Sequence, residues 1–385
     1  MLEQELNVKR AAEHLAAAGH ADTFGENLAQ AAANYALLES RLTPVSGGPE
    51  LLAVLLQRSA QCPFPAAAFN NVERFFSSVE DPEPLVRLLL GEPNALNALF
   101  ALFGYSQFLS DVLIRHPEWL FWLADPAVLL EVRPPAVFRR EVQAVVERYS
   151  ERNALRDALC LLRRREILRI GARDVLGLAT TEEVSRELSD LAQAIISAAA
   201  DLARRAAVAR FGHPVPEAAS WEATTPECAS DVNVAAVSGE GDAPAHRTCG
   251  MCVIGMGKLG GRELNFSSDI DLVFIYEAEG ETTGRVTDGR RVGVVSNHQF
   301  FTRMGEELIR FLAERGPEGI LYRVDMRLRP EGADGPLVRS LESFIAYLRE
   351  QARDWERVAY LKARVMSGPS HLAERLYRVT DQFVF

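Results

Sequence analysis

Apolar residues recur at helical spacing through most of the first 210 residues, in alanine- and leucine-rich segments separated by prolines and glycines. Leu85 to Leu90, Leu96 to Phe103 and Phe108 to Ile114 supply the clearest apolar faces. The pattern predicts a helical region over residues 1–212. Near its end, residues 153–177 are expected to form one long helix and residues 181–210 another, with Thr181 as the N-cap of the second.

Arginines crowd the predicted helix at 153–177. An apolar stripe is provided by Leu161, Leu162, Ile167, Leu168 and Ile170, so several of the arginines are expected to face solvent. A binding role toward phosphate or an acidic protein surface is the alternative, because arginine recognises both. The arginines concerned are Arg156, Arg163, Arg164, Arg165, Arg169 and Arg173.

The pattern changes at residue 213. Residues 213–250 are rich in proline and glycine and are expected to form a connector, in which Thr224 to Thr248 reads as an exposed insertion. Two short apolar runs follow, Val253-Ile254 and Ile270 to Tyr276, which predict two strands. We expect the core of the functional region at 251–338 and C-terminal helices at 339–385.

Two aspartates stand where the second of these strands begins. Asp269 and Asp271 are two residues apart, so on a strand they project from the same face, while Ile270 and Leu272 point into the core. Paired carboxylates at this spacing can hold a hard cation such as Mg²⁺. Taken alone, the motif also fits a tight turn with two solvated aspartates, because charged residues are mostly just exposed.

A glycine-rich turn connects the two strands. Its glycines would let backbone amides approach a phosphate group closely, and neighbouring side chains could add donors. The letters also match the G-x-G-x-x-G dinucleotide fingerprint, with Glu277 downstream, but no further alternation of strands and helices follows. A P-loop fits less well, since Leu259 follows the lysine where Ser or Thr is needed. The candidate phosphate-binding residues are Gly257, Lys258, Gly260, Gly261, Ser267 and Ser268.

Residues 319–330 alternate between apolar and charged positions and predict a third strand. Its charged face carries Asp325 together with Arg323, Arg327 and Arg329. If this strand lies beside the second, Asp325 completes a site of three carboxylates. Arg327 or Arg329 can then bind phosphate through its planar guanidinium. This combination favours a functional site over a solvated turn.

Three further segments surround the predicted strands. Glu279 to Asn297 is expected to form a loop or loose hairpin beside the site, and Gln299 to Arg315 an amphipathic helix. Ser340 is expected to cap a helix that continues through Trp355 and Lys362.

Composition and charge narrow the function classes. The chain has 385 residues, 48% of them hydrophobic, and a formal net charge of -11, which argues against nucleic acid as a partner. No apolar run reaches the length of a membrane span, and five scattered cysteines suit a reducing compartment, so we expect a cytoplasmic protein. Cys249 and Cys252 form a lone C-x-x-C, for which metal or redox use is the minor alternative.

Gly257-Lys258, the segment from Ser268 to Leu272 and Val324-Asp325-Met326 resemble the nucleotidyltransferase superfamily pattern of a glycine turn, an Asp-x-Asp strand and a third acidic strand. The usual Gly-Gly or Gly-Ser turn reads Gly257-Lys258 here, which leaves open which glycines contact phosphate. The resemblance implies an α+β fold, in which a largely helical chain surrounds a nucleotidyltransferase (polymerase-beta-like) domain with a small mixed sheet.

Longer segments carry a closer resemblance. GMGKLGGRELNFSSDIDL, NHQFFTRMGEELIRFL, YRVDMRLRPEGADGPLV and RDWERVAYLKARVMSG are similar to the bifunctional glutamine synthetase adenylyltransferase and adenylyl-removing family. The motifs SSDIDL and VDMRLRP look like its N-terminal, adenylyl-removing half, and an end at Phe385 suits an excised half.

This resemblance implies phosphorolysis of adenylyl-tyrosine on glutamine synthetase, with release of ADP. Asp269, Asp271 and Asp325 would be catalytic and would hold Mg²⁺. A PII signal protein, inorganic phosphate and ADP or ATP are further implied partners. Forward transfer of AMP from ATP and a catalytically silent regulatory module remain the alternatives.

Overall fold

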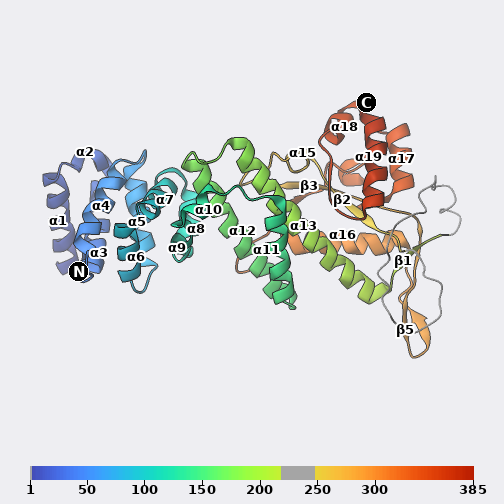
Figure 1. Ribbon diagram of the computed structural model, residues 1–385, viewed down its shortest axis with the longest axis horizontal. Coiled ribbons are helices and arrows are strands. Elements are labelled where there is room, and N and C mark those ends of the chain that lie inside the picture. Colours follow the sequence, from blue (N-terminus) through green and yellow to red (C-terminus); the bar gives the residue numbers. More distant parts are fainter. Residues whose placement is uncertain (1, 218–247) are drawn as a thin grey trace. The chain divides into compact units, whose positions relative to one another are not determined.

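The computed structural model describes residues 2–217 and 248–385. The expectation of an α+β chain, largely helical with a small mixed sheet, is confirmed (Figure 1). The chain divides into two compact units, one made of residues 1–132 and 163–184 and the other of residues 133–162 and 185–385. The predicted limit at residue 212 therefore falls inside the second unit. The predicted insertion lies outside the described residues, except for Thr248.

The first unit is helical. Its apolar residues recur every three or four positions and are buried, as Phe69, Val72, Phe75 and Phe76 are on one helix. The helices that lie entirely in this unit are α1 (Leu2–Ala17), α2 (Ala21–Phe24), α3 (Leu28–Leu42), α4 (Gly48–Ala60), α5 (Pro65–Ser77), α6 (Glu83–Gly91), α7 (Pro93–Tyr105), α8 (Gln107–Arg115), α9 (Trp119–Leu123) and α10 (Pro126–Leu130).

Two long helices contribute to both units, α12 (Arg152–Val175) and α13 (Thr181–Phe211). Both were predicted, with one shift. The N-cap of the second helix is Thr180 rather than Thr181, because its Oγ1 accepts from the N–H of Glu183 at 3.2 Å while its own N–H donates to the Glu183 carboxylate at 2.8 Å. This reciprocal pair is a capping box.

Several arginines of α12 were expected to face solvent, but three of the six do not. Arg156, Arg169 and Arg173 are buried. In the first unit, Arg169 pairs with buried Glu166 at 2.9 Å, and Arg173 donates to the carbonyl oxygen of Leu129 at 3.1 Å. Both guanidinium groups also donate to the carbonyl oxygen of Glu131, just after α10. They thus satisfy backbone acceptors at a helix C-terminus, where cations are favoured.

The second unit contains the sheets and the remaining helices. Its elements besides α12 and α13 are α11 (Pro135–Arg148), β1 (Pro214–Pro216), β2 (Met251–Gly255), α15 (Gly257–Gly260), β3 (Ile270–Tyr276), β4 (Gly280–Thr282), β5 (Arg285–Thr287), β6 (Arg290–Val292), α16 (Asn297–Ala313), β7 (Val324–Asp325), β8 (Val338–Ser340), α17 (Leu341–Glu350), α18 (Asp354–Tyr360), β9 (Arg364–Ser367) and α19 (Ser370–Val384). β5 and β6 form the expected hairpin.

The main sheet has the order β7-β3-β2-β9, and β8 also pairs with β3. β2 is antiparallel to β3 and β9, whereas β7 and β8 run parallel to β3, so the sheet is mixed. Both faces of β3 are covered. Val273 and Ile275 join a buried cluster with α17, α18 and α19, while Phe274 and Tyr276 pack against α16. A strand covered on both sides reads as a continuous apolar run.

Three predicted elements differ from the structure. The expected strand at 319–330 is reduced to Val324–Asp325, because the chain turns at once: the Asp325 carboxylate accepts from the N–H of Arg327 at 2.8 Å. The expected helix through Trp355 and Lys362 breaks into α17 and α18, since the Glu356 carboxylate accepts from the N–H of Arg353 at 3.3 Å and starts a new helix. Strand β9 then lies where only helices were expected.

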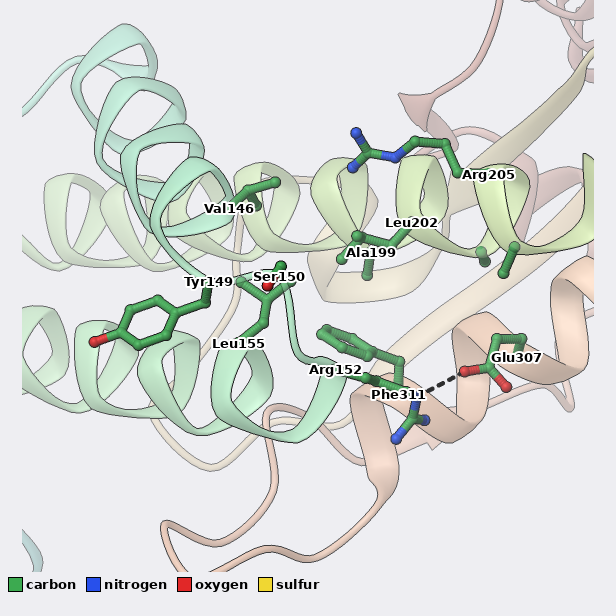
Figure 2. A pocket seen from close by; sticks show the side chains of 12 residues that line it. Val146, Tyr149, Ser150, Arg152, Leu155, Ala199, Leu202, Arg205, Glu307 and Phe311 are labelled. Carbon is green, nitrogen blue, oxygen red and sulfur yellow. Dashed lines mark hydrogen bonds and ion pairs between the residues drawn. The ribbon is translucent and has the colours of Figure 1, made fainter. Parts of the chain in front are cut away.

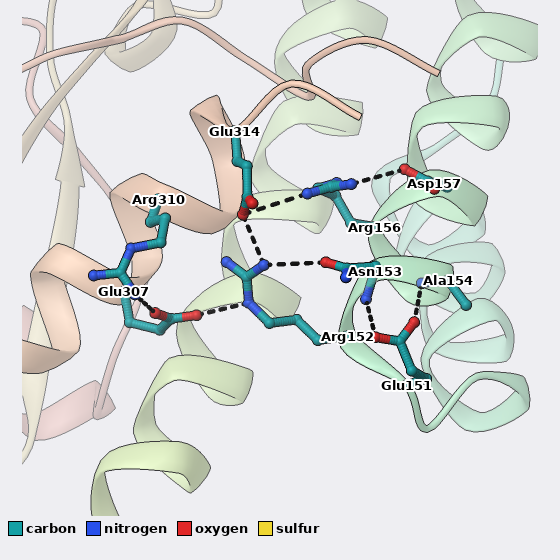
Figure 3. A network of polar contacts seen from close by, with 9 residues as sticks. All are labelled: Glu151, Arg152, Asn153, Ala154, Arg156, Asp157, Glu307, Arg310 and Glu314. Carbon is teal, nitrogen blue, oxygen red and sulfur yellow. Dashed lines mark hydrogen bonds and ion pairs between the residues drawn. The ribbon is translucent and has the colours of Figure 1, made fainter. Parts of the chain in front are cut away.

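A network of ion pairs fixes the C-terminal end of α16 to the start of α12 (Figure 3). Arg152 donates to Glu307 at 2.8 Å and to Glu314 at 2.7 Å, and Arg156 reaches Glu314 at 3.3 Å. From this anchored end, the carbonyl oxygen of Leu312 accepts from the N–H of Tyr322 at 2.9 Å. The network thereby helps to position the segment that leads to Asp325.

A cavity of about 340 Å³ lies beside this network, among α11, α12, α13 and α16 (Figure 2). Leu155, Leu202 and Phe311 give it an apolar wall, and Arg152 lies over the Phe311 ring at 5.5 Å. Cation–π contact of this kind helps to hold the arginine in place.

Among the described residues, no single helix is long and apolar enough to cross a membrane. The successive helices α6 and α7 reach that length only together, and the chain bends by 104° between them.

Candidate active site

The register of the sheet brings the predicted aspartates together. Asp271 lies directly opposite Asp325, because β3 and β7 are parallel with Ile270 opposite Val324. Asp269 immediately precedes β3, and the N–H of Ile270 donates to the carbonyl oxygen of Arg323 at 3.0 Å, which extends the pairing by one step. Three carboxylates from two neighbouring strands therefore occur at one end of the sheet.

Arginines hold two of the three carboxylates. Arg323 donates to Asp269 at 2.5 Å, and Arg327 donates to Oδ1 of Asp325 at 3.0 Å and to its Oδ2 at 2.8 and 2.5 Å. In the described residues, no group of three Asp, Glu, His or Cys side chains is arranged to hold a metal ion. The carboxylates are instead neutralised by exposed arginines, whose side chains are 65% and 81% accessible and can move away at little cost.

The carboxylates differ in proton affinity. Burial raises the pKa of Asp271 above its ordinary value, and the negative charges of Asp325 and Asp269 raise it further. Hydrogen bonds from Arg327 lower the pKa of Asp325. Of Asp271 and Asp325, Asp271 is therefore the carboxylate whose charge gains more from a nearby cation.

The glycines of the turn have two different structural roles. Gly257 has φ of +54°, and a Cβ placed there would be 2.8 Å from Oδ2 of Asp271, so this glycine keeps the backbone close to the carboxylates. The N–H of Met256 donates to the carbonyl oxygen of Asp271 at 2.9 Å and sets that approach. Gly260 instead packs against the carbonyl oxygen of Lys362, and Gly261 lies beside the side chains of Lys362 and Glu263.

The other predicted phosphate ligands lie around this turn. Lys258 is exposed on the four-residue helix α15. The Ser268 hydroxyl accepts from the N–H of Asn265 at 3.1 Å, so it closes a turn, and the carbonyl oxygen of exposed Ser267 accepts from Arg323 at 2.9 Å. Lys258 therefore has the freest side chain for an anion.

The two candidate phosphate-binding arginines have different environments. Arg329 is half-buried, and its guanidinium donates to the carbonyl oxygens of Met326, Ala333 and Gly335 at 2.8–3.2 Å. It holds the loop that follows β7. Arg327 faces the carboxylates and is the better placed of the two to contact a phosphate group. Arg323 was not among the predicted site residues. Its position two residues before Asp325 on an alternating segment could have indicated that it lies on the same face as Asp325.

Strand β9 and helix α13 support the glycine turn. Arg364 on β9 donates to the carbonyl oxygens of Gly260 and Leu259, each at 3.1 Å, and to the side chain of Gln193 on α13. Arg262 pairs with Asp190 at 3.1 Å, and Ser189 Oγ accepts from the N–H of Leu264 at 3.2 Å. Helix α13 is therefore part of the scaffold of the site.

The donors present fit a hard divalent cation. Carboxylate oxygens are the ligands that Mg²⁺ prefers. Asp271 is partly desolvated beside two other carboxylates, and a glycine without a Cβ leaves space next to its Oδ2. The C-x-x-C pair is less suited than the aspartates to bind a metal ion. Cys249 and Cys252 are buried, and burial raises the pKa of the Cys252 thiol to about 12, which disfavours the thiolate that binds metal.

Comparison with known proteins agrees with the family resemblance of the sequence motifs. The model of the glutamate-ammonia ligase adenylyltransferase family matches residues 96–226 and 220–378. Two curated bifunctional glutamine synthetase adenylyltransferase/adenylyl-removing enzymes are similar. The one from Shewanella frigidimarina is 34% identical over 83% of this chain, and the one from Thioalkalivibrio sulfidiphilus is 38% identical over 75%. The matched regions span 30% and 26% of those relatives' lengths.

Proposed function

The chain belongs to the glutamate-ammonia ligase adenylyltransferase family, and on this premise we propose that it removes AMP from an adenylylated tyrosine of glutamine synthetase by phosphorolysis. The site would be of the nucleotidyltransferase type, with Asp269, Asp271 and Asp325 as its catalytic residues. The observation that carries the proposal is the register that sets Asp271 opposite Asp325, with Gly257 beside the Asp271 carboxylate. The similarity of SSDIDL and VDMRLRP to the adenylyl-removing half supports the direction of the reaction.

In the proposed reaction, an oxygen of inorganic phosphate forms a bond to the phosphorus of the adenylyl group. The bond from that phosphorus to the tyrosine oxygen breaks, and the phenolate leaves and takes up a proton. The products are ADP and an unmodified tyrosine, so atoms and charge balance. No oxidant or reductant is needed.

The chain's own residues supply binding and orientation. Arg327 and Arg323 would exchange their carboxylate partners for phosphate oxygens, because both side chains are exposed and guanidinium binds phosphate through paired hydrogen bonds. That exchange would leave Asp269, Asp271 and Asp325 available to hold Mg²⁺. Bound Mg²⁺ would supply charge neutralisation at the bridging phosphate. Lys258 could add a further positive charge.

The partners and the location follow from the same proposal. Glutamine synthetase is the protein substrate named for the curated relatives, and we propose it as the substrate here as well. On the basis of the family resemblance, we also propose a PII signal protein as a regulator and a cytoplasmic location.

The test is an assay of the full chain with adenylylated glutamine synthetase, Mg²⁺ and inorganic phosphate. The intact mass of the target subunit should fall by one adenylyl group, and chromatography should show ADP, with both changes dependent on phosphate. With ATP and unmodified target, little AMP should be transferred. Net incorporation of AMP would support the forward transferase instead, and release of AMP without phosphate would indicate a hydrolase.

A further inference from the structure

A second cavity, of about 510 Å³, lies against the proposed catalytic centre. The two share Arg327, which contacts Asp325 and also lines the cavity. The other walls come from the loop after β7, the end of α17 and the start of α18. The volume lies in the range of small-molecule sites.

The cavity lies on the face of the sheet from which Asp271 projects. Residues two apart on a strand share a face, so Asp271 lies on the same side as Val273 and Ile275. These two pack in one buried cluster with Tyr347 of α17, and Tyr347 is part of the cavity wall. A ligand that spans from the cavity to the carboxylates therefore need not cross the sheet.

The floor of the cavity is fixed, while its rim is open. The Tyr347 hydroxyl donates to the buried Glu356 carboxylate at 2.7 Å and accepts from the N–H of Glu331 at 3.3 Å. At the rim, the Trp355 side chain is 51% exposed, and Gln351 and Arg353 are also exposed. A large aromatic ring left half in solvent beside a cavity is a surface on which a planar group can stack.

The charges of the cavity indicate which part of a nucleotide it suits. Besides Arg327 and Arg353, its lining includes Glu331 and Asp334. Carboxylates repel phosphate but accept hydrogen bonds from hydroxyl groups, so the interior suits the uncharged nucleoside end. The phosphate end belongs at Arg327, where the cavity meets the catalytic carboxylates.

We propose that this cavity binds the adenosine portion of the nucleotide, with the adenine ring stacked on Trp355. The side-chain amide of Gln351 can then pair with the adenine edge, since an amide matches its donor and acceptor pattern. This inference rests on the proposed function, because it assumes that the adenylyl phosphate lies at Asp269, Asp271 and Asp325. It goes further in naming the residues that select the base.

The first experiment measures binding of ADP with Mg²⁺ to the full chain by intrinsic fluorescence and calorimetry. The chain has four tryptophans. We expect ADP to quench the fluorescence of the wild type and of the control Trp119→Phe, which alters a tryptophan of the first unit, stacked on His116. The quenching should be lost in Trp355→Phe. Trp355→Ala should weaken ADP binding about 10-fold, since base stacking is lost, and Trp355→Phe should retain most of the affinity.

A second experiment compares ADP with GDP. Gln351→Ala should reduce the preference for ADP, whereas Trp355→Ala should weaken both nucleotides. Thermal melting should stay at the wild-type temperature for all these variants, because the altered side chains are exposed or, for Trp119, half-buried at one end of α9.

The inference and the proposed function can fail separately. If the full chain deadenylylates its target and Trp355→Ala binds ADP as tightly as the wild type, the cavity assignment is wrong and the function stands. If ADP binding depends on Trp355 but no deadenylylation occurs, the function is wrong and the nucleotide site stands. If Trp355→Ala weakens binding of glutamine synthetase and leaves ADP binding unchanged, the cavity receives the protein substrate instead.

Discussion

At the scale of single residues, Asp271 has the most distinctive environment of the three carboxylates. Burial and two neighbouring negative charges raise its pKa, so over the range between its unfolded and folded pKa the folded chain binds more protons than the unfolded chain. Stability therefore falls as pH rises through that range. At neutral pH, the charged Asp271 side chain destabilises the metal-free fold.

We expect Asp271→Asn to lower deadenylylation on the order of 100-fold or more, because a charge opposite the reacting phosphate is lost. Thermal stability of the metal-free chain at pH 7 should be unchanged or slightly higher. Asp325→Asn is the matched control: Arg327 lowers the pKa of Asp325, so this change should remove activity with no gain in stability. An active Asp271→Asn enzyme, or one that melts far below wild type, would contradict the assignment.

Arg327 and Arg329, two residues apart, are expected to have opposite phenotypes. Arg327→Ala should raise the KM for phosphate about 10- to 100-fold with little change in stability, since an exposed charge-assisted contact is removed. Arg329→Ala should destabilise the chain by about 1–3 kcal/mol, because three backbone carbonyl oxygens lose their donor. Phosphate titrations and chemical denaturation measure the two effects. Equal effects of both variants on KM would mean that the arginines are not divided in this way.

At the scale of elements, the strands that carry the site differ in how far they could be predicted. β2 and β3 were predictable because a strand covered on both faces is a continuous apolar run. The length of β7 was overestimated. The alternation over residues 319–330 gives no sign of the turn that follows Asp325, in which the N–H of Arg327 donates to the Asp325 carboxylate. β9 was missed, because its four residues gain their strand identity from pairing with β2 across more than 100 positions.

The different roles of the glycines in the turn could not be predicted from the sequence. Spacing alone left Gly257, Gly260 and Gly261 as equal candidates, and what separates them is their neighbours: a carboxylate for Gly257, the backbone of Lys362 for Gly260 and the side chains of Lys362 and Glu263 for Gly261. The sequence contains no local signal for these long-range neighbours. That the three aspartates lie close together could be predicted, because their spacing follows strand geometry.

Gly257→Ala tests the turn that connects β2 to α15. A left-handed residue with a Cβ costs about 1–2 kcal/mol, and the added Cβ would lie 2.8 Å from the Asp271 carboxylate. We expect a stability loss of about that size together with a fall in activity of about 10-fold or more, as the carboxylate is displaced. Gly261→Ala is the control, since its φ of -73° suits any residue and its neighbours are flexible side chains. Similar losses in both variants would show that the approach of Gly257 to Asp271 is unimportant.

At the scale of the whole chain, the compact units do not follow the order of the sequence. A helical region ending at residue 212 was expected from composition, but residues 133–162 and 185–211 belong to the unit that contains the sheet. Composition cannot show this, because a helix that supports a sheet has the same apolar periodicity as one in a helical bundle. The buried arginines of α12 were hidden for a similar reason: their carbonyl partners lie about 40 positions away.

This organisation predicts the behaviour of a fragment that begins at residue 213. Such a fragment keeps all three aspartates but lacks Ser189, Asp190 and Gln193, which hold the segment from Leu259 to Leu264 and the β9 arginine. It also lacks α11 and the start of α12, so Glu307 and Glu314 lose Arg152. The exposed apolar face of α16 and the unanchored glycine turn should prevent a cooperative fold.

We therefore expect fragment 213–385 to show no cooperative thermal transition and no deadenylylation, while the full chain shows both. Arg364→Ala in the full chain tests the same support of the glycine turn with a smaller change. It should lower stability by about 1–3 kcal/mol, because the half-buried guanidinium no longer satisfies the carbonyl oxygens of Leu259 and Gly260. Activity should fall with it, since the same carbonyls belong to α15, which begins at Gly257. A fragment 213–385 that melts cooperatively and releases ADP would show that the sheet and its C-terminal helices suffice, and that α13 only covers a site already formed.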